Sequence, residues 1–90
     1  MGEGAGMPVL SPRHRALGAA IRELRTERAM TQETLADGAG LTANYVGDTE
    51  RGERNISVRA LWQLADALGV PTADLLRAAD DHAVKRSPRR

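Results

Sequence analysis

The chain has 90 residues, with 13 Lys and Arg against 12 Asp and Glu, and it contains no cysteine. This length accommodates one compact domain with loose ends, and the absence of cysteine excludes a disulfide framework, a thiolate metal site and a Cys nucleophile. Apolar residues make up 41% of the chain, but there is no Phe, one Trp and one Tyr, so the predicted core is aliphatic.

The chain begins with a Gly- and Pro-rich segment, which we expect to be a disordered arm over residues 1–10. It lacks the basic start and apolar run of a signal peptide. No apolar stretch approaches the roughly 20 residues needed to cross a bilayer. We therefore expect a cytoplasmic protein without a membrane partner.

Hydroxyl residues mark the predicted helix starts. Thr31, Thr42 and Ser57 each follow an apolar residue and precede another by four positions, which is a capping residue with a hydrophobic staple. Thr72 repeats the pattern after a proline. Ser11 is followed by a proline, which favours the first position of a helix. Five helices are predicted from these signals.

The predicted stops agree with the starts, because Gly40, Gly52 and Gly69 stand where helices begun at the preceding caps should end. The predicted helices span residues 12–28, 32–39, 43–51, 58–68 and 73–79. Their apolar residues recur at helical spacing, and no segment alternates as a strand does. The fold class is therefore all-α, a five-helix bundle over residues 11–79.

Only Gly40 and Leu41 join the second and third predicted helices. Such a short connection forces a sharp crossing of the two helices, as in a DNA-reading helix-turn-helix. Ala36 lies where the third helix would press on the second, and its small side chain permits that approach.

The net positive charge lies in the C-terminal tail. Between residues 13 and 77, nine arginines balance nine Asp and Glu, and the surplus comes from Lys85, Arg86, Arg89 and Arg90. Net charge alone therefore does not predict nucleic-acid binding. We expect residues 80–90 to form a basic disordered tail.

The segment TQETLADGAGLTANYVGDTERGERNISVRALWQLADALGV resembles the phage-repressor and Cro (XRE-like) type of helix-turn-helix domain. The resemblance extends over roughly residues 17–76. Compact members include controller proteins of restriction–modification systems and some antitoxins, and Arg54-Asn55-Ile56-Ser57 looks most like the controllers. The resemblance implies a lambda-repressor-like domain whose third helix enters the major groove, with a homodimer reading a near-palindromic operator.

The resemblance also implies residue roles. The base-facing positions are Ala43, Asn44 and Asp48. Asn44 can pair with adenine through N6 and N7, and Ala43 can touch a thymine methyl group. Asp48 could accept from a cytosine amino group, or it could be a solvated or salt-bridged carboxylate.

Backbone contacts and an ion pair complete the implied site. The implied phosphate contacts are Gln32, Thr42, Tyr45, Arg51, Arg54 and Asn55. Arg25 and Glu50 match positions that pair across the first and third helices in relatives.

The predicted function is transcriptional control by sequence-specific binding to double-stranded DNA, with no cofactor or metal. The alternative is an antitoxin or adaptor whose main partner is another protein, which the neutral core and Asp48 favour. We do not expect an enzyme, because no catalytic triad, paired acidic set, phosphate-binding Gly loop or metal-ligand spacing is present. Trp62 could be a half-covered helix residue or part of a dimer interface.

Overall fold

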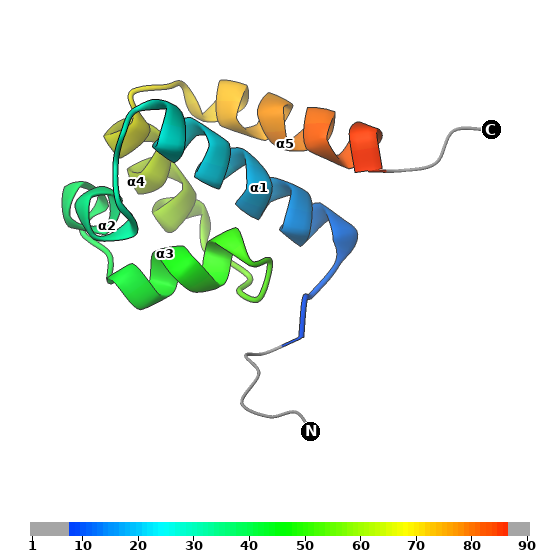
Figure 1. Cartoon of the computed structure of the whole chain (residues 1–90), viewed down its shortest axis with the longest axis horizontal. Coiled ribbons are helices and arrows are strands. Elements are labelled where there is room, and N and C mark those ends of the chain that lie inside the picture. The colour runs from blue at the N-terminus through cyan, green and yellow to red at the C-terminus, as the bar shows by residue number, and fades with distance from the viewer. Residues whose placement is uncertain (1–7, 87–90) are drawn as a thin grey trace.

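The computed structural model describes residues 8–86, and within this range it contains five helices and no strand (Figure 1). The helices are α1 (Pro12–Glu27), α2 (Gln32–Ala39), α3 (Ala43–Glu50), α4 (Val58–Leu68) and α5 (Thr72–Arg86). The predicted all-α, five-helix fold class is confirmed. Over the same range, none of the helices combines the length and apolarity that crossing a membrane requires.

Four of the five helices begin at the predicted hydroxyl caps. The side-chain oxygens of Ser11, Thr31, Thr42 and Ser57 each accept a hydrogen bond from the backbone N–H three residues later, over 2.9–3.2 Å. Each bond satisfies an N–H group that would otherwise have no partner in the first helical turn.

Thr72 is not a cap, and this prediction is wrong. Thr72 is the first residue of α5, and the carbonyl of Pro71 accepts from the backbone N–H groups of Asp74 and Leu75 at 3.0 and 3.2 Å. The first helical hydrogen bonds thus start one residue earlier than the hydroxyl pattern indicates.

Each helix contributes one large, fully buried aliphatic side chain to the core. These side chains are Ile21, Leu35, Val46, Leu64 and Leu75, all with 0% exposure. Alanines such as Ala20 and Ala65 fill the space between them and let the helices approach closely. Burial of aliphatic surface is therefore the force that joins all five helices into one unit.

α5 is longer than predicted and runs beside α1 (Figure 1). We predicted its end near Ala79 and a disordered tail from residue 80, which is wrong for residues 80–86. Asp80 pairs with Arg13 of α1 at 3.2 Å, and His82 lies 2.7 Å from Glu23 of α1. These contacts with α1 add tertiary stabilisation to a segment that no Gly or Pro interrupts.

The sequence predicted only in part where the ordered region of the chain begins and ends. Leu10, assigned to the disordered arm, donates its backbone N–H to the Gly52 carbonyl at 2.9 Å, so the ordered part begins earlier than predicted. The rest of the predicted disorder, at residues 1–7 and 87–90, lies outside the described residues.

Candidate nucleic-acid interface

The turn before α3 sets the direction of that helix. Gly40 ends α2 in the left-handed conformation, with φ of 71°, and Leu41 donates its N–H to the Ala36 carbonyl at 2.9 Å. Thr42 then caps α3. A glycine is needed at residue 40 because L side chains rarely adopt positive φ. The predicted helix-turn-helix elbow thus consists of Gly40, Leu41 and the capping residue Thr42.

α3 has one buried side and one exposed side. Val46, Gly47 and Thr49 face the body of the protein and are buried, whereas Asn44 is exposed. Thr49 is 2% exposed, and its hydroxyl donates to the Tyr45 carbonyl at 2.8 Å, so its burial leaves no unpaired donor. The amide of Asn44 is therefore directed away from the core and accessible to a partner.

α1 supports α3 through an unusually close backbone approach. A Cβ atom added at Gly18 would lie 2.6 Å from the carbonyl carbon of Glu50 and would collide with the Thr49 carbonyl oxygen. Only glycine fits this position. Our sequence reasoning missed this role, since nothing in the local pattern shows that a helical glycine faces another backbone.

The Arg25–Glu50 pair joins α1 to the end of α3. The Arg25 guanidinium donates to both carboxylate oxygens of Glu50, at 2.6 and 3.0 Å, and to the Met30 carbonyl at 2.8 Å. The two side chains are 11% and 4% exposed. The hydrogen bond to Glu50 raises the pKa of Arg25 above its ordinary value. This geometry is bidentate, which fixes orientation as well as distance.

Gln32, an expected phosphate contact, lies against the same ion pair. Its Nε2 donates to Glu50 Oε1 at 3.0 Å. Glu50 therefore receives hydrogen bonds from α1 and from the first residue of α2. This three-residue network links the helices on both sides of α3 to its C-terminal end.

The two expected phosphate-binding arginines near the end of α3 are paired with carboxylates. Asp48 accepts from Arg51 at 2.6 Å and from Arg54 at 3.1 Å, and Glu53 accepts from Arg51 Nε at 3.1 Å. The Arg54 guanidinium lies 4.2 Å from the centre of the Tyr45 ring, a cation–π contact. Both arginines remain substantially exposed, with side-chain values of 54% and 41%.

Asn55 is held by a histidine that our sequence analysis did not single out. His14 Nε2 lies 3.1 Å from Asn55 Oδ1, and His14 Nδ1 lies 2.6 Å from the Ser11 hydroxyl. His14 and Asn55 are far apart along the chain, so no local pattern could have linked them. When the ring donates to Oδ1, the amide N–H groups of Asn55 are left available for an acceptor.

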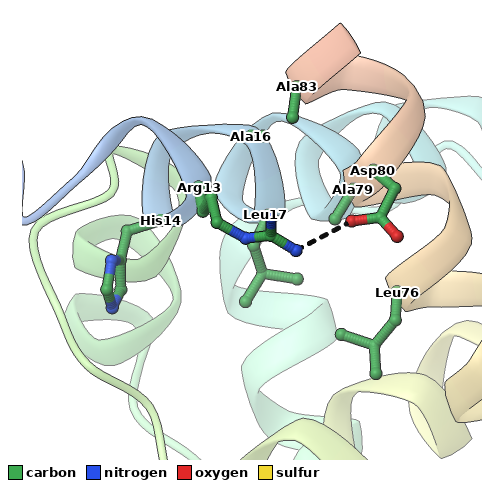
Figure 2. Close-up of a pocket in the computed structure, with 8 residues that line it drawn as sticks. All are labelled: Arg13, His14, Ala16, Leu17, Leu76, Ala79, Asp80 and Ala83. Carbon is green, nitrogen blue, oxygen red and sulfur yellow. Dashed lines mark hydrogen bonds and ion pairs between the residues drawn. The ribbon is translucent and has the colours of Figure 1, made fainter.

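Apart from Gln32 and Arg25, the sequence-predicted residues thus come together on α3, on its capping residue Thr42 and on the loop after it. A separate shallow groove lies between α1 and α5, and Figure 2 shows Leu17 and Leu76 in its lining beside the Arg13–Asp80 pair. Within residues 8–86, no three His, Cys, Asp or Glu side chains are placed to hold a metal ion. Trp62 on α4 is 56% exposed.

Residues 21–75, more than half of the chain, match the helix-turn-helix family. The chain is 37% identical over 65 residues to an uncharacterised HTH-type transcriptional regulator of Sinorhizobium fredii, covering 72% of this chain and 84% of that protein. It is 40% identical over 60 residues to the control protein C.BamHI of Bacillus amyloliquefaciens, covering 66% and 74%. The crystal structure of the restriction–modification controller protein C.AhdI of Aeromonas hydrophila superposes with a TM-score of 0.71 at 42% identity, covering 72% of this chain and 98% of that one. The chain therefore belongs to the phage-repressor and Cro type of the helix-turn-helix family of DNA-binding transcriptional regulators.

Proposed function

We propose that the protein controls transcription by binding a near-palindromic operator as a homodimer. The observation that carries this proposal is the exposed Asn44 near the start of a helix whose opposite side is sealed against the core. A short, rigidly seated helix with a free amide at its N-terminal end has the form that a major-groove reader requires.

In this proposal α3 lies in the major groove. Ala43, Asn44 and Asp48 occupy the base-facing positions. Asn44 pairs with an adenine through N6 and N7, and Ala43 contacts a thymine methyl group. Thr42, Tyr45, Arg51, Arg54 and Asn55 lie towards the phosphates, together with Gln32 at the start of α2. Half-sites would lie about one turn of DNA, roughly 34 Å, apart.

The proposed function is tested by enriching random duplexes against the purified protein at two salt concentrations. We expect one motif with two-fold symmetry, and a complex of two protein chains per duplex by light scattering. Binding should weaken steeply with salt, because each neutralised phosphate adds about 0.9 to the slope of log affinity against log salt. The absence of any enriched motif would refute sequence-specific binding.

A second candidate is an adaptor or antitoxin function with a protein partner. The paired state of Arg51 and Arg54 supports it, because two of the cations beside α3 already have anionic partners. This candidate predicts weak DNA binding with a shallow salt slope, together with tight binding to a co-purifying protein. A cytoplasmic location stays a prediction under both candidates.

A further inference from the structure

Two arginines, the C-cap Arg51 and Arg54 in the loop after α3, both bond to the carboxylate of Asp48. Asp48 Oδ1 lies 2.6 Å from Arg51 Nη2, and Asp48 Oδ2 lies 3.1 Å from Arg54 Nη2. Each carboxylate oxygen thus serves a different guanidinium. We name this arrangement the carboxylate clamp, consisting of Asp48, Arg51 and Arg54.

Further contacts hold the arginines in this clamp. Arg51 Nε donates to Glu53, whose side chain is only 12% exposed, and Arg54 stacks over the Tyr45 ring. The two arginines and the two carboxylates sum to zero formal charge. The surface at the end of α3 is therefore electrically balanced at the place where a reader of DNA needs positive charge.

A carboxylate and a DNA phosphate bind a guanidinium in the same way, because each presents two anionic oxygens that accept hydrogen bonds from its N–H groups. Asp48 occupies the Nη2 group of both arginines and offsets their positive charge, so it competes with a phosphate for both. Resting on the proposed function, we propose that Asp48 is an internal competitor for DNA phosphate. A phosphate that takes up the Nη2 group of either arginine must displace an oxygen of Asp48 from that group.

The exchange lowers affinity for every duplex, because phosphates carry no sequence information. Pairing with Asp48 also makes the salt dependence of DNA binding shallower. Arginines that stay on Asp48 neutralise no phosphate and therefore release no counterions from DNA. The direction in which Asp48 changes DNA affinity distinguishes a competitor from a base-reading residue. A competitor weakens binding when present, whereas a cytosine-reading carboxylate strengthens binding at one base pair.

The test compares wild-type protein with Asp48→Asn on the enriched operator and on a short duplex of scrambled sequence, over a range of salt concentrations. Asp48→Asn keeps the shape of the side chain and removes its charge. We expect about three- to tenfold tighter binding to both duplexes, in keeping with the modest strength of exposed ion pairs. The salt slope should steepen by about 0.9 for each arginine released to a phosphate.

Two controls separate the clamp from a general effect of charge. Asp66→Asn removes the same charge from the exposed side of α4 and should change neither affinity nor slope. In a background with Arg51→Ala and Arg54→Ala, Asp48→Asn should lose most of its effect on DNA affinity, because Asp48 then has no guanidinium group to pair with. Thermal unfolding of each variant verifies that it is folded.

Three results would overturn the proposal. The first is an Asp48→Asn protein with the affinity and salt slope of wild type, while wild type still enriches a motif; the clamp then fails and the proposed function stands. The second is weaker operator binding with a changed preference at one base pair, which would make Asp48 a base reader. The third is an undiminished gain in the double-arginine background, which would mean that Asp48 acts on DNA directly. If neither protein binds any duplex at low salt, the proposed function itself fails.

Discussion

Gly18 of α1 lies directly beneath the Thr49 carbonyl of α3, with no room for a side chain between the two helices. We expect Gly18→Ala to destabilise the protein by about 1–3 kcal/mol, because the added methyl group must displace backbone rather than a flexible side chain. This loss should appear even though alanine is the better helix former by about 1 kcal/mol. Urea unfolding monitored by circular dichroism measures the change.

The matched control is Gly38→Ala in α2. A Cβ atom there would meet the Ala67 methyl at 3.5 Å, an ordinary contact distance. We expect this variant to gain up to about 1 kcal/mol from helix propensity. Equal effects of the two substitutions would show that the close approach of α1 to α3 is not a constraint.

The Arg25–Glu50 pair should be costly to break from one side. Glu50→Ala leaves a guanidinium that is 11% exposed without its carboxylate, and we expect a loss of about 3–5 kcal/mol. A loss of that size lowers the melting temperature of a domain this small by more than about 12 °C. Thermal unfolding followed by circular dichroism provides the measurement.

Two comparisons sharpen this prediction. Asp80→Asn breaks the exposed Arg13–Asp80 pair and should cost less than about 1 kcal/mol. The double variant Arg25→Met, Glu50→Met removes both charges and should recover at least part of the stability lost in Glu50→Ala. A Glu50→Ala protein as stable as Asp80→Asn would contradict the buried character of the pair.

The cap of α3 offers a test that links stability to binding. Thr42→Ala removes the acceptor for the Tyr45 N–H and should cost about 0.5–2 kcal/mol of unfolding free energy. Thr42→Ser keeps a hydroxyl acceptor and should remain close to wild type. Frayed N-terminal residues of α3 should also weaken operator binding, as measured by fluorescence anisotropy. Full stability in Thr42→Ala would argue against the cap.

Two asparagines on the proposed DNA-binding surface should respond differently to the same substitution. Asn44→Ala should relax preference at one base pair and cost about 1–3 kcal/mol on the operator. Asn55→Ala should weaken binding to all duplexes alike, because a phosphate contact carries no sequence information. Motif enrichment with each variant distinguishes the two. An unchanged motif for Asn44→Ala would remove Asn44 from the base-reading positions.

Local signals in the sequence were enough for most of the fold. Thr31 and Thr42 cap helices because a hydroxyl before an apolar-periodic run acts within its own turn. The end of α5 was misplaced because Asp80 and His82 contact α1, and a contact such as His82 with Glu23 has no local signature. Gly18 was missed for the same reason.

The sequence indicated which residues belong to the candidate site, but it did not predict which of their charged side chains form ion pairs with one another. The resemblance implied a base-facing position for Asp48 and phosphate contacts for Arg51 and Arg54, and it left open whether Asp48 reads a cytosine or is a solvated or salt-bridged carboxylate. The answer depends on the loop after α3, where Gly52 has a φ of 77° and the Glu53 N–H bonds to the Asp48 carbonyl. That turn brings Arg54 back to Asp48, and it follows from backbone geometry rather than from spacing.

The short elbow between α2 and α3, from Gly40 to Thr42, also has a mechanical consequence. Together with the Gly18 contact and the Arg25–Glu50 pair, it restrains the tilt of α3 relative to α1 and α2. In the proposed complex with α3 in the major groove, a mismatch between the two surfaces would therefore have to be accommodated by the DNA, through bending of the duplex or narrowing of its groove. Base steps that the protein never touches would then affect operator strength through their stiffness.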